Sequence, residues 1–474
     1  MKQYVICVDQ STTNTKVFLY DTQGRICYDT ARKHRQIYPQ SGWVEHDPME
    51  IYEHMMSGIR DVIAHADGEL LGLALTNQRE TIVLWDRLTG LPVHHAIVWQ
   101  CRRTAELCES MKRYQPIVEK KTGLTIDPYF SATKLKWMLD KQSDDTSLYA
   151  GTMDAWLLYK LTGKHCCDPT NASRTLLYNL KENCWDQELL HIFGIPKHIL
   201  PEIIDSDGVF GVAEIDGISL PVLSVMGDSQ SALVGHQAMH VGDVKITLGT
   251  GSSVLMNQGN ECKENAFGVV SALAYQTTKK RCYASEAIIN SSADTLNWLR
   301  DDINLFHQDS QLNSIGQDSH GVYLVPAFVG LGIPYWNTKA KACISGISRS
   351  TTKEDMIIAG LQSIAFQIYD ALSALQKQTG VEAKLLSVDG GASHNPNLMQ
   401  LLSDLCEKEV VTYDQSDFSA LGVVQLALAK LGKPLATIKP KASYHPHMDD
   451  KQRKALLAGW RQAIEMVLFD SERR

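Results

Sequence analysis

Two turns in this chain combine hydroxyl, amide and glycine residues in a way that suits phosphate binding. Residues 9–15 (DQSTTNT) follow the apolar run 4–8, and residues 249–253 (GTGSS) follow the apolar run 244–248. Backbone N–H groups of a tight turn, together with Ser and Thr hydroxyls, can meet phosphate oxygens without adding bulk. One such turn alone is typical of a polar hairpin, but two, each after an apolar strand, favour a phosphate site.

Two carboxylates stand where apolar runs end. Asp9 closes the run before the first turn, where it can hold Mg²⁺ through water or serve as an Asx-turn residue. Asp228 follows the apolar run 220–226 at the expected start of a helix. It can act there as a general base toward an attacking hydroxyl in phosphoryl transfer, or as a helix N-cap. The residues alone leave both pairs of alternatives open.

Four further side chains could bind a polyol. Arg79 and Glu80 are adjacent after the apolar run 73–75, and together they can donate and accept hydrogen bonds to vicinal hydroxyls. The competing interpretation is a surface ion pair, which contributes little free energy. Trp99 and Tyr129 offer flat apolar faces for polyol C–H groups, although such aromatic residues are more often part of a core.

The elements that must position these residues form two similar units. Each turn lies between two short strands, and a third strand, residues 385–388, runs into the glycine turn 389–393 and then a helix through 398–405. Helical spacing of apolar residues also predicts helices over 355–375 and 451–468. This pattern predicts an α/β protein with duplicated domains, 1–236 and 237–474, facing each other across a cleft.

Composition excludes several classes of protein. The net charge of −8, without a basic stripe interleaved with aromatic residues, argues against a nucleic-acid partner. No GxxxxGK[ST] motif occurs, so the chain is not a P-loop enzyme, and no apolar run approaches the ~20 residues of a membrane span. Eleven cysteines without a CxxC pair predict small buried residues in a reducing cytosol, and the short apolar start is no signal peptide, so we expect a cytoplasmic protein.

Several separated blocks of the sequence resemble the FGGY carbohydrate kinases, and most closely the members that phosphorylate glycerol. The most specific blocks are 37–48, 77–80, 96–104, 122–131, 171–175 and 330–336. The resemblance implies two ribonuclease-H-like domains of the actin, hexokinase and Hsp70 type, flanking a deep cleft. It also implies transfer of the γ-phosphoryl group of ATP to a primary hydroxyl of a small polyol.

The resemblance further assigns roles to individual residues. Asp228 is implied as the catalytic base, Asp9 as the residue near Mg²⁺, and Arg79, Glu80, Trp99 and Tyr129 as the polyol pocket. The residues implied to contact the nucleotide are Thr12, Thr13, Asn14, Lys16, Thr250, Gly391 and Asn395, with Ala293 and Asn297 near the purine. The family often forms dimers or tetramers, and the sequence does not decide the oligomeric state.

The chain departs from the glycerol-phosphorylating members at substrate-side positions. Ser229 replaces a glutamine after the base, and Ser253 replaces a phenylalanine that packs on the glycerol carbons. Ser11, Ala293 and Asn297 are further replacements, and the loop 214–218 lacks the residues associated with regulation by fructose bisphosphate. We place Ser229 and Ser253 in the substrate pocket, where the missing ring leaves room and two hydroxyls favour a hydrogen-bonding substrate.

Three functions therefore stay open at this point. Glycerol is the expected substrate, and a four- or five-carbon polyol or ketose such as erythritol, xylitol, xylulose or ribulose is the alternative. A catalytically silent sugar-binding regulator on the same fold is the third. It is less favoured because Asp9, Asp228, Arg79 and Glu80 are all present.

Overall fold

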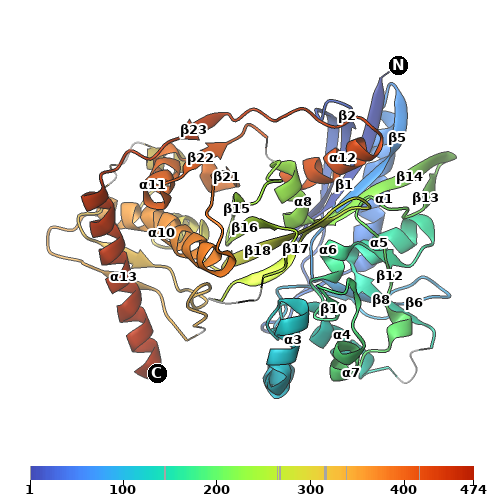
Figure 1. The fold of residues 1–474 in the computed structure, drawn as a ribbon, viewed down its shortest axis with the longest axis horizontal. Helices are drawn as coiled ribbons and strands as arrows, with labels where there is room; N and C mark the ends of the chain where they lie inside the picture. The colour runs from blue at the N-terminus through green and yellow to red at the C-terminus, as the bar shows by residue number, and fades with distance from the viewer. Residues whose placement is uncertain are drawn as a thin grey trace.

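The computed structural model describes residues 2–473 except 143–145, 264, 266, 267, 314, 315, 317, 338 and 416. The chain forms two α/β lobes, each built on its own sheet (Figure 1). We call them the N-terminal lobe, which holds the six-stranded sheet, and the C-terminal lobe, which holds the seven-stranded sheet. The two duplicated α/β units predicted from the sequence are confirmed.

The N-terminal sheet has the strand order β13-β14-β5-β1-β2-β3. Its three central strands, β14, β5 and β1, are parallel, and the outer pairs are antiparallel. The strands are β1 (Gln3–Gln10), β2 (Asn14–Asp21), β3 (Ile26–Lys33), β5 (Glu69–Asn77), β13 (Val212–Ile215) and β14 (Ile218–Gly227). Because β1 and β5 are buried on both faces, they read as continuous apolar runs in the sequence.

The C-terminal sheet has the strand order β17-β18-β16-β15-β21-β22-β23. Here β15, β21 and β22 are parallel, and the remaining neighbours pair antiparallel. The strands are β15 (Asp243–Leu248), β16 (Ser252–Gly259), β17 (Val270–Gln276), β18 (Arg281–Ile289), β21 (Leu385–Asp389), β22 (Glu409–Thr412) and β23 (Ala442–Tyr444). A hairpin followed by a parallel neighbour thus recurs in both sheets.

Smaller sheets complete both lobes. A four-stranded sheet, β4-β7-β6-β8, lies in the N-terminal lobe, and three two-stranded sheets, β10-β11, β12-β9 and β19-β20, accompany the main ones. Their strands are β4 (Glu45–His46), β6 (Ile82–Asp86), β7 (Ala96–Ile97), β8 (Leu148–Thr152), β9 (Cys166–Cys167), β10 (Tyr178–Asn179), β11 (Cys184–Trp185), β12 (Glu202–Ile203), β19 (Tyr323–Val325) and β20 (Cys343–Ser345).

The helices cover the sheets. Those of the N-terminal half are α1 (Pro48–Ala64), α2 (Ala105–Met111), α3 (Gln115–Thr122), α4 (Ser131–Leu139), α5 (Met153–Thr162), α6 (Pro169–Ala172), α7 (Gln187–Phe193) and α8 (Asp228–Gly235). Those of the C-terminal half are α9 (Asp294–Asn297), α10 (Lys353–Thr379), α11 (Pro396–Cys406), α12 (Phe418–Lys430) and α13 (Asp450–Arg473). Side chains cap the N-termini of several helices: Asp47 caps α1, and Thr352 and Asp355 form a capping box on α10.

Helix α10 is long and apolar enough to cross a membrane by length and composition, but 72% of its most apolar window is buried inside the protein. It packs in the core of the C-terminal lobe through residues such as Ile364, Phe366 and Ile368. Seven of the eleven cysteines are buried, as predicted for small apolar residues, and Cys27 is exposed.

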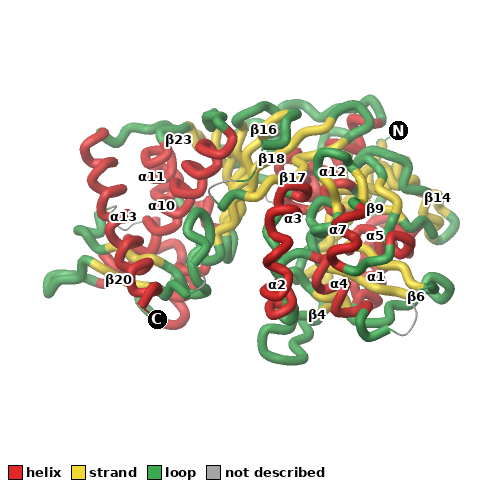
Figure 2. Tube along the Cα trace, turned by 60° about the horizontal axis from the view of Figure 1, so that its bottom comes forward, coloured by secondary structure: helices red, strands yellow, loops and turns green. Residues whose placement is uncertain are grey.

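Helix α12 connects the lobes. It comes from the C-terminal half of the sequence but packs against α8 and against strands β1, β5 and β14 of the N-terminal sheet (Figures 1 and 2). A buried cluster at this place joins Phe418 of α12 and Leu233 of α8 with Val5 of β1 and Leu255 of β16. The division of the chain near His236 stays a prediction, and α12 shows that the C-terminal half also contributes to the N-terminal lobe.

Candidate active site

The parallel strands of the N-terminal sheet bring the predicted site residues to one edge. Strand register pairs Asp9 with Thr76 and Gly227 with Asn77, so β1, β5 and β14 end side by side. The carboxyl ends of parallel strands are the usual place for a ligand in an open α/β sheet. Asp9, the segment 78–80 and Asp228 therefore gather at this edge.

Asp228 is the first residue of α8, and it is not the N-cap. The N-cap position belongs to Gly227, and the Asp228 carboxylate accepts a hydrogen bond from the amide of Ser229 at 2.6 Å. The Nε atom of Arg79 lies 3.2 Å from Asp228 Oδ1, while 37% of the Asp228 side chain stays exposed. The carboxylate is thus held at one oxygen and accessible to a ligand.

Arg79 and Glu80 do not form a surface pair, because both side chains are almost completely buried. Arg79 Nη2 donates to Glu286 Oε1 at 3.0 Å, and Arg79 Nη1 donates to Gln230 Oε1 at 3.1 Å. Arg174 Nε donates to Glu80 Oε1 at 2.6 Å. We call Arg79, Glu80, Arg174 and Glu286 the ionic cluster.

The ionic cluster is balanced in charge and spans both lobes. Arg174 Nη1 lies 2.8 Å from Glu286 Oε2, so Glu286 of β18 meets two arginines of the N-terminal lobe. Burial alone raises the pKa of Glu286, but the Arg174 and Arg79 guanidinium groups outweigh it and lower that pKa to about 2. Two cations thus face two anions, and Glu286 stays ionised throughout the physiological pH range.

Glu80 adopts a backbone conformation that is rare for residues other than glycine. Its φ is +62°, in the left-handed region, and its carbonyl accepts a hydrogen bond from Ser131 Oγ at 2.8 Å. Non-glycine residues persist there when their surroundings fix them, and they concentrate at functional sites. This conformation turns the chain directly after Arg79, so both charged side chains enter the ionic cluster.

Trp99 and Tyr129 are neighbours at this site. Their ring centroids lie 5.4 Å apart with a tilted arrangement, and both side chains are only partly buried. Trp99 Nε1 donates a 2.9 Å hydrogen bond to Thr12 Oγ1 of the first turn. The aromatic pair therefore contacts the first turn, and it is not enclosed in the core.

The first turn connects β1 to β2 and is closed by the Ser11 amide donating to the Asn14 carbonyl at 2.9 Å. Thr13 is exposed, whereas the ammonium group of Lys16 pairs with Asp417, which precedes α12, at 2.6 Å. At the mouth of the turn, Asp9 Oδ2 accepts a hydrogen bond from Ser419 Oγ at 2.6 Å.

Asp9 is not an Asx-turn residue, because its carboxylate bonds to α12 and not to the turn that follows. Burial raises the pKa of Asp9 to about 6, and the nearby negative charge of Asp228 acts in the same direction. Two carboxylates are therefore held close together at the end of β1 and β14.

The second turn, 249–253, and the glycine turn 389–393, which we call the third turn, lie against each other in the C-terminal lobe. Parallel register pairs Thr247 with Asp389, so β15 and β21 end together. At Gly390, φ is +92° and an added Cβ would lie 2.3 Å from the Leu248 carbonyl oxygen, so only glycine fits this contact. Gly391 has open space around it, which leaves its backbone accessible.

Ala293 and Thr250 also lie together. The Ala293 amide donates to the Gly249 carbonyl at 3.1 Å, and the Ser292 amide donates to the Thr250 carbonyl at 2.9 Å. Asn297 lies one turn further along and is exposed, and its Oδ1 accepts a hydrogen bond from Arg300. These residues share one region with the second turn.

Asn395 has a structural role in the third turn region. Its side chain caps α11 by accepting a 2.9 Å hydrogen bond from the Leu398 amide, and its Nδ2 donates to Asn313 Oδ1 at 3.1 Å. Its contact with a nucleotide stays a prediction.

Ser253 lies beside the ionic cluster, and Ser229 is partly exposed next to Asp228. Ser253 Oγ donates to Glu286 Oε1 at 3.3 Å, so its hydroxyl is engaged by the protein. The structure thus brings Arg79, Glu80, Asp228 and Ser253 together.

Sequence reasoning missed three residues of this site. Arg174 lies in the family block 171–175 and Gln230 two positions after Asp228, so both were within reach of the resemblance. Glu286 had no such signal in the sequence, because its partners are 112 and 207 residues away. The only indication was a carboxylate in the middle of the largely apolar strand β18.

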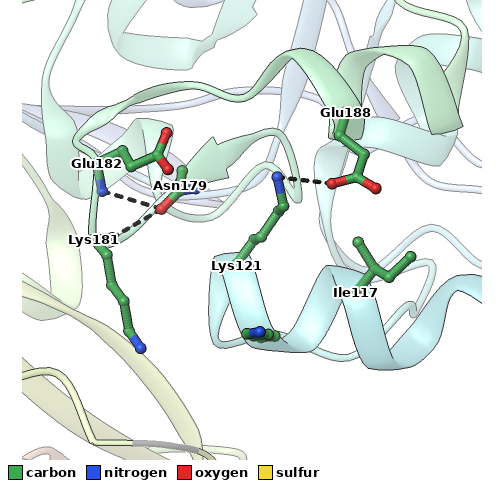
Figure 3. A pocket seen from close by; sticks show the side chains of 7 residues that line it. Ile117, Lys121, Asn179, Lys181, Glu182 and Glu188 are labelled. Atoms are coloured by element: carbon green, nitrogen blue, oxygen red, sulfur yellow. Dashed lines mark hydrogen bonds and ion pairs between the residues drawn. The ribbon is translucent and has the colours of Figure 1, made fainter.

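A separate hollow lies on the surface of the N-terminal lobe, with a volume of ≈ 290 Å³ (Figure 3). Lys121 lies in it and pairs with Glu188 at 2.9 Å, while Asn179 accepts from the Lys181 and Glu182 amides. None of the predicted site residues lines this hollow.

Comparison with known proteins agrees with this arrangement. A glycerol kinase of Shewanella amazonensis is 41% identical over 98% of this chain and 99% of its own length. Glycerol kinase 1 of Thermotoga maritima is 40% identical, with 98% and 100% covered. The crystal structure of Plasmodium falciparum glycerol kinase with ADP superposes with a TM-score of 0.93 at 32% identity, covering 98% of each chain.

The family assignment follows from the domain matches. Residues 4–235 match the N-terminal domain of the FGGY family of carbohydrate kinases, and residues 244–431 match its C-terminal domain. The two-domain fold expected from the resemblance is confirmed by the superposition. This chain belongs to the FGGY family of carbohydrate kinases.

Proposed function

We propose that the protein is a glycerol kinase, which transfers the γ-phosphoryl group of ATP to a primary hydroxyl of glycerol and gives glycerol 3-phosphate. One observation carries the proposal: the accessible Asp228 carboxylate lies 3.2 Å from Arg79 of a buried ionic cluster. The 40–41% identity to glycerol kinases over nearly the whole chain supports the choice of substrate.

The charge balance of the ionic cluster favours a neutral substrate. Arg79 and Arg174 are already paired with Glu80 and Glu286, so the cluster offers hydrogen bonds without surplus charge. A substrate that carries a carboxylate would bring an unpaired anion beside Asp228, which is unfavourable in a buried site. A polyol hydroxyl can accept from Arg79 and donate to Glu80.

The site residues support in-line phosphoryl transfer. Asp228 accepts the proton of the attacking hydroxyl, and Arg79 holds that carboxylate in place through its Nε atom. The aromatic pair, Trp99 and Tyr129, packs on the carbon atoms of the substrate. Backbone amides of the three turns, with the Thr12 and Thr250 hydroxyls, bind the phosphate oxygens and offset their developing charge. The other nucleotide contacts proposed are Thr13, Asn14, Lys16, Ala293, Asn297, Gly391 and Asn395.

Mg²⁺ fits at Asp9. The Asp228 charge contributes to the raised pKa of the buried Asp9 carboxylate, and a divalent cation would relieve this repulsion. Carboxylate oxygens and water are the ligands Mg²⁺ prefers. When bound with the nucleotide, the ion would neutralise charge on the β- and γ-phosphates.

A four- or five-carbon polyol or ketose is the second candidate substrate. The observation that favours it is Ser253, whose small side chain lies beside Glu286 where a ring is expected in glycerol-phosphorylating relatives. We further propose that the enzyme acts in the cytoplasm on small substrates, without a nucleic-acid or membrane partner.

The test is a coupled assay of ADP release against glycerol, erythritol, xylitol, ribulose and xylulose. We expect the highest kcat/KM with glycerol. A preference for a longer substrate would move the proposal to the second candidate, and no turnover with any of them would favour a sugar-binding regulator.

The Asp228→Asn variant tests the base. We expect it to bind ADP normally in calorimetry but to lose about 10²–10⁴-fold in kcat, because the amide cannot accept the proton. Asp216→Asn is the matched control, since Asp216 is exposed and pairs with Arg60 away from the site. Near-normal turnover of Asp228→Asn would remove the assignment.

A further inference from the structure

His46 lies in the block 37–48 and has no role assigned so far. It is connected by hydrogen bonds to residues of the candidate active site. His46 lies in the short strand β4 and is completely buried, and both of its ring nitrogens are hydrogen-bonded. A buried histidine with two polar partners is a fixed orienting element.

The Nε2 side of the His46 ring is connected to the first turn by hydrogen bonds. His46 Nε2 lies 2.9 Å from Gln36 Oε1, and Gln36 Nε2 donates to the Thr12 carbonyl at 2.8 Å. His34 Nε2 reaches the same carbonyl at 2.9 Å, so the Thr12 carbonyl is held by two side chains.

The Nδ1 side of the ring is connected by hydrogen bonds to Trp99 of the aromatic pair. Gln78 Nε2 lies 3.2 Å from His46 Nδ1, and Thr81 Oγ1 donates to Gln78 Oε1 at 3.0 Å. The Trp99 amide donates to Thr81 Oγ1 at 3.3 Å, and the Trp99 indole donates to Thr12 Oγ1 at 2.9 Å.

These bonds close into a ring, which we call the hydrogen-bond circuit. Its six members are Thr12, Gln36, His46, Gln78, Thr81 and Trp99. Because Trp99 has two donors, the bonds run from Trp99 in both directions and meet at Thr12, which accepts at its carbonyl and at its hydroxyl.

The circuit permits one protonation state of His46. Gln36 Oε1 can only accept, so His46 Nε2 must donate; Gln78 Nε2 can only donate, so His46 Nδ1 must accept. Burial lowers the pKa of His46 to about 3, with a smaller contribution from His34, so the neutral ring is maintained at physiological pH.

The circuit also sets the direction of the Thr12 hydroxyl. Because Thr12 Oγ1 accepts the indole N–H of Trp99, its own proton is free to point toward an anion. The same bond fixes the Trp99 ring against which Tyr129 lies.

We propose that His46 is a positioning residue that ties the phosphate-binding turn to the polyol pocket through the hydrogen-bond circuit. The proposal rests on the proposed function, because it takes Thr12 as a nucleotide contact and Trp99 as a polyol contact. Loss of His46 should therefore weaken nucleotide and polyol binding together, although it touches neither.

The experiment measures ADP affinity by calorimetry, together with KM for ATP and for glycerol, in His46→Leu and Gln36→Leu. We expect each variant to lose about tenfold in ADP affinity and to raise KM for both substrates. His46→Gln, which keeps one donor and one acceptor, should recover most of the affinity. Gln36 is only partly buried, so Gln36→Leu reports on the circuit even if His46→Leu fails to fold.

A double-mutant cycle tests the coupling. Trp99→Phe alone should weaken ADP binding, but in the His46→Leu background it should add little, because the circuit is already open. His165→Leu is the matched control: His165 is a partly buried histidine of the same lobe that bonds to the Ala150 carbonyl outside the circuit.

Three outcomes would overturn the proposal: unchanged ADP affinity in a folded His46→Leu or Gln36→Leu, fully additive effects in the cycle, or an equal loss in His165→Leu. The ADP measurement needs no turnover, so it separates this proposal from the proposed function. If the wild-type protein fails to phosphorylate glycerol but the variants change ADP affinity as expected, the circuit proposal stands and glycerol is rejected as the substrate.

Discussion

At the scale of single residues, the candidate site is defined by charges that are buried yet paired. A buried ion requires a partner and hydrogen bonds, since its desolvation is otherwise too unfavourable. Arg79 meets this requirement with two hydrogen-bond acceptors, Gln230 and Glu286, and with an ion pair to Asp228. Because those partners come from α8 and β18, the orientation of Arg79 reports on both elements.

Ser253→Phe tests how the pocket selects its substrate. The added ring should fill space beside Glu286 and raise the ratio of kcat/KM for glycerol to that for erythritol by about tenfold, as expected for a contact of this size. The measurement is the substrate panel with purified variant and wild type. Ser253→Ala, which removes only the hydroxyl bonded to Glu286, is the control for loss of that bond. An unchanged ratio in Ser253→Phe would show that position 253 does not limit substrate length.

Residue types, together with the resemblance of the sequence to the family, predicted most of the residues that gather here, including Arg79, Glu80 and Asp228. They could not show that Arg79 and Glu80 are buried, because burial depends on how distant segments pack. Glu286 was missed for the same reason: its chemistry is visible only once β18 is placed beside the N-terminal lobe.

At the scale of elements, the contact between α8 and α12 positions two carboxylates at once. Asp228 begins α8, and Ser419 of α12 donates to Asp9. The helices approach closely at two glycines: an added Cβ at Gly422 would lie 1.8 Å from the Ser231 carbonyl oxygen, and one at Gly235 would lie 2.3 Å from the Phe418 carbonyl oxygen. Such backbone contact leaves no room for a side chain.

Gly422→Ala should therefore push α12 away from α8. We expect the free energy of unfolding to fall by about 1–3 kcal/mol, as for other overpacked sites, despite the better helix propensity of alanine. Thermal unfolding measures the loss, and kcat should fall as well because Asp9 and Asp228 shift. Gly316→Ala is the control, since among the residues that the structure describes its methyl group would meet no atom closer than 3.9 Å. A Gly422→Ala protein as stable and active as wild type would contradict this account of the helix contact.

The elements themselves were largely predictable from periodicity and turn residues. The helix expected over 355–375 is α10 (Lys353–Thr379), and the strand–turn–strand units are β1–β2 and β15–β16. The docking of α12 on the opposite lobe was not predictable, because its apolar surface has no single face that identifies its partner. Tertiary packing decided its place.

At the scale of the whole molecule, the ionic cluster and the cluster around α12 are two of the places where the lobes are joined. The first is polar and lies at the candidate active site, whereas the second is apolar. Glu286 is the member of the ionic cluster that the C-terminal lobe contributes. Its charge therefore contributes to the stability of the contact between the lobes.

Glu286→Gln should destabilise the protein in a pH-dependent way. Because the folded pKa of Glu286, about 2, lies below its ordinary value of 4.5, its charge contributes stability above pH 4.5, on the order of 3 kcal/mol, which is lost as pH falls toward 2. The variant lacks this contribution, so the difference in Tm between wild type and Glu286→Gln should be largest near pH 7 and shrink below pH 4.5. Glu214→Gln, at an exposed carboxylate, should leave Tm unchanged. A Glu286→Gln difference that stays constant from pH 7 to 3 would show that the paired charge does not hold the lobes together.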